Sequence, residues 1–128
     1  MGHDDILPAV AEQLSLEYRN GILTVSYVGA LESVDEAQRM QTAIEAACNE
    51  HGTRYLLFDN RTTTAPTEDV RDSMFKWAIG WCGRGALVLD SELAAVRMNM
   101  NALAAGGRLR AFPSVAEAEL WLRKGMPK

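Results

Sequence analysis

Residues 54–67 read RYLLFDNRTTTAPT, and this stretch carries the clearest signal for the fold. The unbroken apolar run at residues 55–58 is typical of a strand in the centre of a sheet. Asp59 ends the run, a threonine-rich loop follows, and Thr67 opens a stretch with helical spacing. A polar loop that leaves a buried parallel strand is where α/β domains usually place binding or regulatory residues. We therefore expect the functional edge of the molecule at this loop.

A β-hairpin precedes this unit. Apolar and polar residues alternate over residues 14–19 and again over residues 22–28. Asn20 and Gly21 separate the two runs, and both residues tolerate the positive φ angles of a type I′ turn. We therefore expect two antiparallel strands here. Residues 1–12 should form a loosely attached lead-in.

Helical and strand-like patterns alternate over the rest of the chain. Two capping boxes, Ser33 with Glu36 and Ser114 with Glu117, precede apolar residues at helical spacing, and Ser91 can cap another helix. The predicted helices start at about residues 33, 67, 91 and 114, and the first three end near residues 51–52, 83 and 106–107; the predicted strands are residues 55–58, 86–89 and 109–112. The helix after Ser91 carries the apolar residues Leu93, Val96, Met100 and Leu103.

The predicted order is β-β-α-β-α-β-α-β-α, in a single domain spanning residues 1–128. Alternation after the hairpin indicates a mostly parallel, mixed sheet with right-handed crossovers. We predict an α/β fold in which a sheet of about five strands packs with about four helices. The sequence shows no internal repeat or linker, and its 48% hydrophobic residues suffice for a core.

Charge and composition argue against several classes of protein. The net charge is −4 and no run of lysine or arginine occurs, so a nucleic-acid partner is not expected. No apolar stretch approaches the length of about 20 residues that spans a bilayer, and the acidic amino terminus does not resemble a signal peptide. Cys48 and Cys82 lie among apolar residues of predicted helices, which favours buried thiols over a disulfide. We expect a cytoplasmic protein.

Four motifs follow one another in a familiar order. They are the hairpin NGILTVSYVG (20–29), the strands YLLFD (55–59) and ALVLD (86–90), and the ending RLRAFPSVAEAELWL (108–122). Together they resemble the STAS superfamily (sulfate transporter and anti-sigma-factor antagonist domains), and its SpoIIAA-like branch of small stand-alone proteins in particular. The similarity covers residues 14–122. It implies a STAS-like fold and a regulatory or ligand-binding scaffold.

One motif of that family differs here. Anti-sigma-factor antagonists of the superfamily carry an Asp-Ser-Ser/Thr-Gly-type motif after the central strand, and a partner kinase phosphorylates its serine. In this chain the position reads Asp59-Asn60-Arg61-Thr62-Thr63. The aspartate matches the motif, whereas the serine and the glycine do not. The resemblance therefore implies the scaffold and leaves the phosphorylation switch open.

The candidate site lies at the carboxyl ends of the predicted parallel strands, where the loops at residues 60–67, 90–91 and 113–114 should meet. Helix amino termini point unpaired N–H groups toward that edge. Together with Arg61 they could bind an anion, and a hydroxyl there could be phosphorylated. Ordinary caps and turns use the same residue types. The candidate partner-binding, anion-binding or switch residues are Asp59, Asn60, Arg61, Thr62, Thr63, Thr64 and Thr67.

A second candidate site is apolar. Methionine and tryptophan together can line an adaptable pocket for a lipid-like molecule, although core packing uses the same stripe. Phe75 and Ile79 fall off the main stripe of their helix, which indicates a second apolar face suited to a homodimer contact or a ligand groove. The candidate apolar-ligand residues are Met74, Trp77, Trp81, Met98 and Met100.

The sequence offers no set of residues for catalysis or metal binding. Cys48 and His51 are three residues apart, but Cys48 lies on an apolar stripe and His51 at a helix end, so a Cys–His nucleophile is not expected. The two histidines and two cysteines show no metal-ligand spacing. Asp59 lacks the acidic neighbours and the lysine that hold a divalent metal and phosphate in receiver domains. We expect neither a cofactor nor a metal.

We therefore predict a non-catalytic regulatory or binding module. It should act through the loop and helix after the central strand, by binding a protein partner, with phosphorylation of a hydroxyl as a means of control. The alternative is a carrier or sensor of a small apolar ligand held between the Trp77/Trp81 helix and the Met98/Met100 helix. An enzyme ranks last, since no acid, base and nucleophile converge in the sequence.

Overall fold

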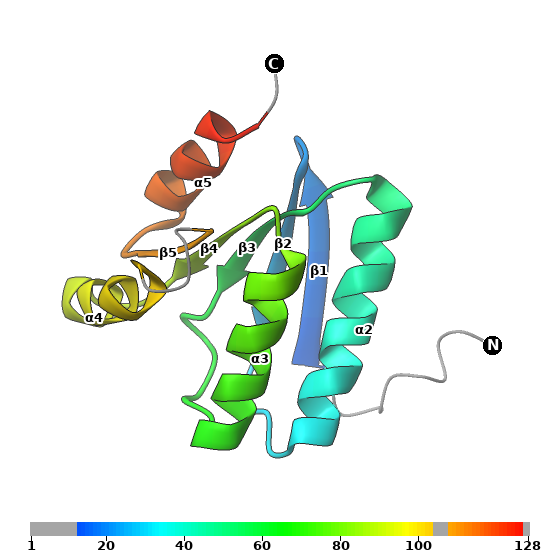
Figure 1. Cartoon of the computed structure of the whole chain (residues 1–128), viewed down its shortest axis with the longest axis vertical. Helices are drawn as coiled ribbons and strands as arrows, with labels where there is room; N and C mark the ends of the chain where they lie inside the picture. Colours follow the sequence, from blue (N-terminus) through cyan, green and yellow to red (C-terminus); the bar gives the residue numbers. More distant parts are fainter. Residues whose placement is uncertain (1–12, 104–107, 127–128) are drawn as a thin grey trace.

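The computed structural model describes residues 13–103 and 108–126, with side chains described to residue 99 in the first range (Figure 1). A five-stranded sheet has the order β1-β2-β3-β4-β5. Strands β1 and β2 pair antiparallel, and β2 to β5 are parallel. The strands are β1 (Leu14–Arg19), β2 (Ile22–Tyr27), β3 (Tyr55–Asp59), β4 (Arg84–Val88) and β5 (Leu109–Phe112); the helices are α2 (Val34–His51), α3 (Glu68–Trp81), α4 (Glu92–Leu103) and α5 (Val115–Lys124). The predicted α/β fold is confirmed.

The hairpin forms as its turn residues require. Asn20 and Gly21 adopt φ angles of 56° and 84°, and Arg19 lies opposite Ile22. These positive φ values fit a two-residue turn that follows the twist of the strands. Strand β2 ends at Tyr27, one residue earlier than predicted.

The helix ends also follow the sequence closely. The Ser33 hydroxyl accepts a hydrogen bond from the Glu36 N–H at 3.1 Å, and Ser114 accepts one from Glu117 at 3.3 Å. Gly52 ends α2 in the left-handed conformation, with a φ of 67°. Both predicted capping boxes thus place a serine at the helix start, because its oxygen satisfies an otherwise unpaired N–H.

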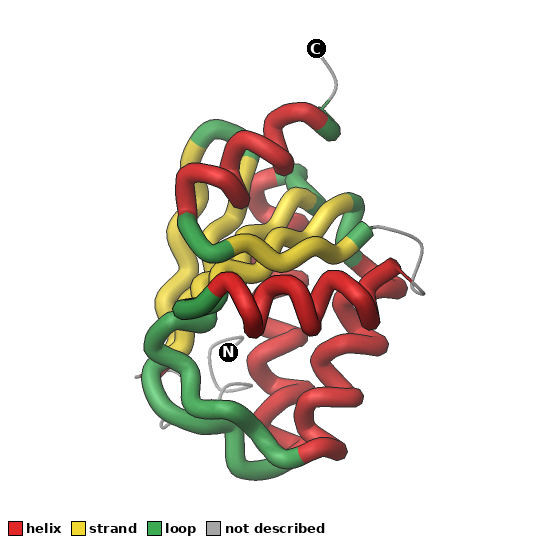
Figure 2. The backbone as a smooth tube through the Cα atoms, turned by 90° about the vertical axis from the view of Figure 1, so that its left-hand side faces the viewer, coloured by secondary structure: helices red, strands yellow, loops and turns green. Residues whose placement is uncertain are grey.

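The core has two layers, one on each face of the sheet, and Figure 2 shows the strands between the helices. Side chains of β2 and β3 such as Val25, Leu56 and Phe58 pack with those of α2 and α3. On the other face, Leu57 and Val88 pack with α5. Because side chains alternate along a strand, the central strands are apolar on both faces, as the unbroken run at residues 55–58 predicts.

Helix α4 lies against β5 at the edge of the sheet (Figure 1). The Asn99 side chain donates to the Ala111 carbonyl at 3.0 Å and accepts from the Ala111 N–H at 2.6 Å. Ala95 is buried, whereas Leu93 and Val96 remain 61% and 56% exposed. The predicted apolar stripe of this helix is therefore wrong for Leu93 and Val96: α4 turns its small and amide side chains toward β5.

Two further expectations concern membrane-spanning helices and thiols. Within the described residues, no helix is long and apolar enough to cross a membrane. Cys48 and Cys82 are both buried and free. Burial raises the pKa of the Cys48 thiol to about 11 and that of Cys82 to about 12, so both thiols stay protonated at neutral pH.

Candidate partner-binding site

The loop between β3 and α3 is fixed to the end of β2. The Gly29 N–H donates to the Thr62 carbonyl at 3.2 Å, and the Thr64 N–H donates to the Gly29 carbonyl at 2.8 Å. These two bonds form an isolated parallel bridge that continues the β2–β3 pairing past the strand ends. Gly29 has a φ of +96°, and a Cβ there would lie 2.7 Å from the Gln13 side chain. The anchor therefore depends on glycine at this position.

Two of the predicted switch hydroxyls belong to the same anchor. The hydroxyls of Thr62 and Thr63 donate to the carbonyl of Tyr27, at 3.2 and 2.8 Å. The backbone N–H of Asn60 donates to the Val88 carbonyl at 3.0 Å, which ties the start of the loop to β4. The loop is thus held by both neighbours of β3, and these hydroxyls have a structural role.

Asp59 and Arg61 form a closed ion pair. The guanidinium donates from Nε to Oδ1 at 2.8 Å and from an Nη to Oδ2 at 2.7 Å, and the Arg61 backbone N–H also donates to Oδ1. These bonds from Arg61 lower the pKa of the Asp59 carboxyl, although partial burial opposes them. Asp59 raises the pKa of Arg61 in return. The charge of Arg61 is therefore already paired with a carboxylate of the same loop.

The start of α3 already holds a carboxylate. The Thr67 hydroxyl donates to Asp69 Oδ1 at 2.6 Å, and the same oxygen accepts from the Val70 N–H at 3.1 Å. The bond from Thr67 lowers the pKa of Asp69. Thr67 is the N-cap residue, as predicted, but it makes no side-chain bond to the helix backbone. With Glu68 beside Asp69, the positive end of the helix dipole faces acidic side chains of its own.

Thr64 differs from the other hydroxyl residues of the loop. Its side chain is exposed, and within the described residues its hydroxyl has no hydrogen-bond partner. Beyond it, the exposed face of α3 carries both signs of charge, with Arg71 and Lys76 near Asp72 along the helix. The seven predicted residues thus lie within residues 59–67, from the end of β3 to the start of α3. We call the exposed part of this region the loop–α3 surface: Arg61, Thr62, Thr64, Ala65, Thr67, Glu68, Arg71, Asp72 and Lys76.

Sequence reasoning missed the partners that hold the loop. Tyr27 and Gly29 lie more than thirty residues upstream, and nothing local to the loop indicates them. The Asp59–Arg61 ion pair cannot be predicted from the sequence either, because the side chain of Arg61, two residues after Asp59, can equally point to solvent. Gly29, at the end of a predicted strand, was the one available hint of a close backbone approach.

Of the two tryptophans in the apolar candidate site, Trp77 contacts α2 and β3, and Trp81 lies under the guanidinium of Arg54. Trp77 donates from Nε1 to Glu45 at 2.7 Å, and its ring stacks on Trp81 with centroids 6.0 Å apart. Trp77 also meets the ring of Phe58 edge to face. Both rings are partly buried and pack against the core.

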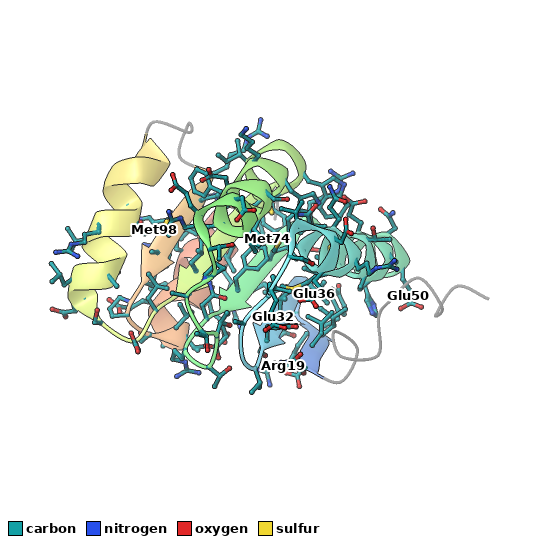
Figure 3. The ribbon with its side chains drawn as sticks, turned by 90° about the horizontal axis from the view of Figure 1, so that it is seen from below. Arg19, Glu32, Glu36, Glu50, Met74 and Met98 are labelled. Atoms are coloured by element: carbon teal, nitrogen blue, oxygen red, sulfur yellow. The ribbon has the colours of Figure 1, made fainter. Side chains whose placement is uncertain are left out.

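The methionines lie apart. Met74 accepts a bond from the Gln41 side chain at 3.4 Å, at the contact between α2 and α3. Figure 3 shows Met98 on α4, away from Met74. The structure does not gather these side chains into one site, and the side chain of Met100 lies outside the described residues. Phe75 and Ile79 are partly buried against the core.

The described residues show neither a reactive cysteine–histidine pair nor a cluster of metal ligands. His51 stacks on Tyr18, with centroids 4.2 Å apart, and its Nε2 lies 3.5 Å from Glu50. Cys48 is buried, and its raised pKa removes the thiolate that a nucleophile needs. Within residues 13–103 and 108–126, histidine, cysteine, aspartate and glutamate form no group of three or more that could hold a metal ion.

Comparison with known proteins identifies the architecture. No family model and no curated protein match the sequence. Among solved structures, a DUF3478-family protein with a SpoIIAA-like fold from Shewanella loihica PV-4 has a TM-score of 0.63 at 18% identity, over 85% of this chain and 91% of that one. An anti-sigma factor antagonist from Mycobacterium paratuberculosis has a TM-score of 0.63 at 16% identity, over 86% and 92%. Unphosphorylated SpoIIAA, an anti-sigma factor antagonist, has a TM-score of 0.57 at 11% identity, over 88% and 99%. This chain therefore has the SpoIIAA-like fold that its sequence motifs indicate.

Proposed function

We propose that this protein is a non-catalytic regulatory module that binds a protein partner through the loop–α3 surface. The observation that carries the proposal is the anchored loop: its backbone bonds to Gly29, and its Thr63 hydroxyl donates to the Tyr27 carbonyl, while side chains such as Thr64 stay exposed. A loop fixed before binding loses little conformational entropy when a partner docks. Two of the similar structures are anti-sigma factor antagonists, which supports a regulatory role.

The charges of this surface favour a protein over a nucleic acid. Arg71 and Lys76 alternate with acidic residues on α3, and Arg61 is neutralised by Asp59. A nucleic-acid site needs a basic patch, whereas a mixed surface gives register and selectivity between proteins. The partner surface should carry charges of both signs in the complementary arrangement.

Control by phosphorylation would fall on Thr64. Asn60 stands where the family motif has its phosphorylated serine, and the hydroxyls of Thr62 and Thr63 are bonded to Tyr27. A phosphate on Thr67 would remove the hydroxyl that donates to Asp69, and its negative charge would repel the Asp69 carboxylate. Thr64 alone of the four combines exposure with an unbonded hydroxyl in the described structure.

Matched charge reversals test the surface. Protein purified from the source organism is used to capture its partner, in wild-type form and with Arg71→Glu on α3 or Arg97→Glu on α4, both exposed arginines. We expect the same protein to be captured by wild type and Arg97→Glu, and at least about tenfold less by Arg71→Glu. Equal capture by all three forms would place the interface elsewhere.

The apolar-ligand alternative stays a prediction without comparable support. Trp77 and Trp81 pack against the core, Trp77 donates to Glu45 of α2, and Met98 lies on a separate helix. Native mass spectrometry of the purified protein checks it. A bound small molecule that is lost on denaturation would revive this alternative.

A further inference from the structure

The two edges of the sheet differ in whether their outward backbone groups are hydrogen-bonded. At the β5 edge, Asn99 of α4 occupies both the N–H and the carbonyl of Ala111. At the other edge lies β1 (Figure 1). Unpaired edge groups are a template for another strand, and native proteins usually block them.

The hairpin pairing shows which groups of β1 face outward. The Gln13 carbonyl accepts from the Val28 N–H at 3.1 Å, and Arg19 lies opposite Ile22 at the closed end of the hairpin. In an antiparallel pair, residues that bond to the partner strand alternate with residues whose N–H and C=O point away. Leu14, Leu16 and Tyr18 therefore present their backbone groups outward, and no described residue outside the hairpin bonds to them.

Within the part of the chain that the structure describes, strand β1 has few of the usual protections of an edge strand. Its six residues, LSLEYR, pair one to one with β2, without a bulge, and include neither proline nor lysine. Its charged residues, Glu17 and Arg19, lie on the same face as Ser15, because side chains alternate along a strand. On the α2 face, Leu14 and Leu16 are only partly buried against the core.

We propose that β1 pairs antiparallel with β1 of a second copy of this chain, about a two-fold axis at Leu16, so that the two five-stranded sheets join into one. In this register Leu14 lies opposite Tyr18 of the second copy, and Leu16 opposite its own equivalent. The N–H of each of the three outward residues then donates to the second copy and its C=O accepts from it, which gives about six backbone hydrogen bonds between the two strands. Apolar side chains meet on the α2 face, and Ser15 meets the Glu17 carboxylate on the other.

The sequence and length of β1 select this register over its neighbours. An axis at Ser15 would leave the outward groups of Tyr18 beyond the end of the partner's β1. An axis at Glu17 would place two carboxylates directly opposite each other, which is destabilising. An axis at Tyr18 would pair Glu17 with Arg19 but would leave the outward groups of Leu14 beyond the end of the partner strand. The pattern is thus self-complementary about Leu16, which is why the occupant is a second copy rather than an unrelated strand.

A register-specific disulfide tests the pairing. The proposed register makes residues 15 and 17 of opposite copies a non-hydrogen-bonded pair, with Cα atoms about 4.5 Å apart, within disulfide range. One variant carries Ser15→Cys and the other carries Glu17→Cys. The two purified variants are mixed and mildly oxidised. We expect a covalent dimer from the mixture and at least about tenfold less from either variant alone, because their equivalent cysteines lie at a diagonal of about 7–8 Å. Cys48 and Cys82 are buried and should not compete.

A second pair of variants distinguishes the registers. Chains with Glu17→Cys and Arg19→Cys should give little cross-link; a strong cross-link between these two would overturn the Leu16 axis. In sedimentation, wild type should have twice the monomer mass of 14.1 kDa. Leu16→Pro removes an outward N–H without touching the bonds to β2 and should weaken the dimer at least about tenfold, whereas Leu16→Val keeps that N–H and should not. A monomeric wild type at about 100 μM with no 15–17 cross-link would overturn the proposal.

Discussion

At the scale of single residues, side-chain hydroxyls in the loop divide into those that hold the backbone and those that face solvent. Thr63 donates to the Tyr27 carbonyl at 2.8 Å, and Thr64 donates to no described residue. The same residue type thus has two roles within two positions. Sequence alone cannot separate them, because the acceptor belongs to another strand.

This division gives a matched pair of substitutions. Thr63→Val keeps the shape of the side chain but removes its donor, so the free energy of unfolding should fall by about 1 kcal/mol. Thr64→Val should change it by less than about 0.5 kcal/mol. Urea denaturation of the two variants checks the difference. Equal effects would show that the Thr63 bond does not hold the loop.

The Asp59–Arg61 pair predicts a dependence of stability on pH. The pKa of Asp59 is lowered in the folded protein, chiefly by the Arg61 side chain. A lowered folded-state pKa stabilises the protein above the unfolded value, about 3.9, and this stabilisation is lost as the pH falls through the folded value. Wild type should therefore lose stability more steeply below pH 4 than Arg61→Gln does. If the free energy of unfolding changes with pH in the same way for both proteins between about pH 2 and 6, the pairing is contradicted.

At the scale of elements, the sequence predicts the strands and helix starts well and the orientation of α4 poorly. Strand β5 and both capping boxes fall where local pattern places them. In contrast, Leu93 and Val96 face solvent, although helical spacing predicts them as part of an apolar stripe. Helix α4 lies beside an edge strand whose backbone N–H and C=O groups need hydrogen-bond partners. The amide of Asn99 can bond to them, whereas a leucine side chain cannot.

Asn99 therefore carries a prediction of its own. Asn99→Ala removes both bonds to Ala111 and should lower the free energy of unfolding by about 2 kcal/mol. It should also expose the β5 edge and increase aggregation, measured by light scattering. Val96→Ala, on the exposed side of the same helix, should change stability by less than about 0.5 kcal/mol. If the two variants behave alike, α4 does not protect the edge through Asn99.

At the scale of the whole molecule, the fold could be predicted because periodicity, caps and the hairpin turn all agree. The position of the loop that carries the proposed surface could also be predicted, since loops after parallel strands gather at one edge. Its chemistry could not. The ion pair at Asp59 and the carboxylate of Asp69 occupy the groups that a free phosphate would use, and the sequence does not show which way these side chains point.

Binding of a protein partner by the loop–α3 surface is the central claim of this account. A photo-activated cross-linking amino acid at Ala65, exposed in the loop, tests it most directly, with the same group at the exposed Ala116 of α5 as the control. After irradiation in cells of the source organism, we expect one protein joined to position 65 and not to position 116. Cross-links from position 116 alone, or a partner that co-purifies without any link to position 65, would contradict the account.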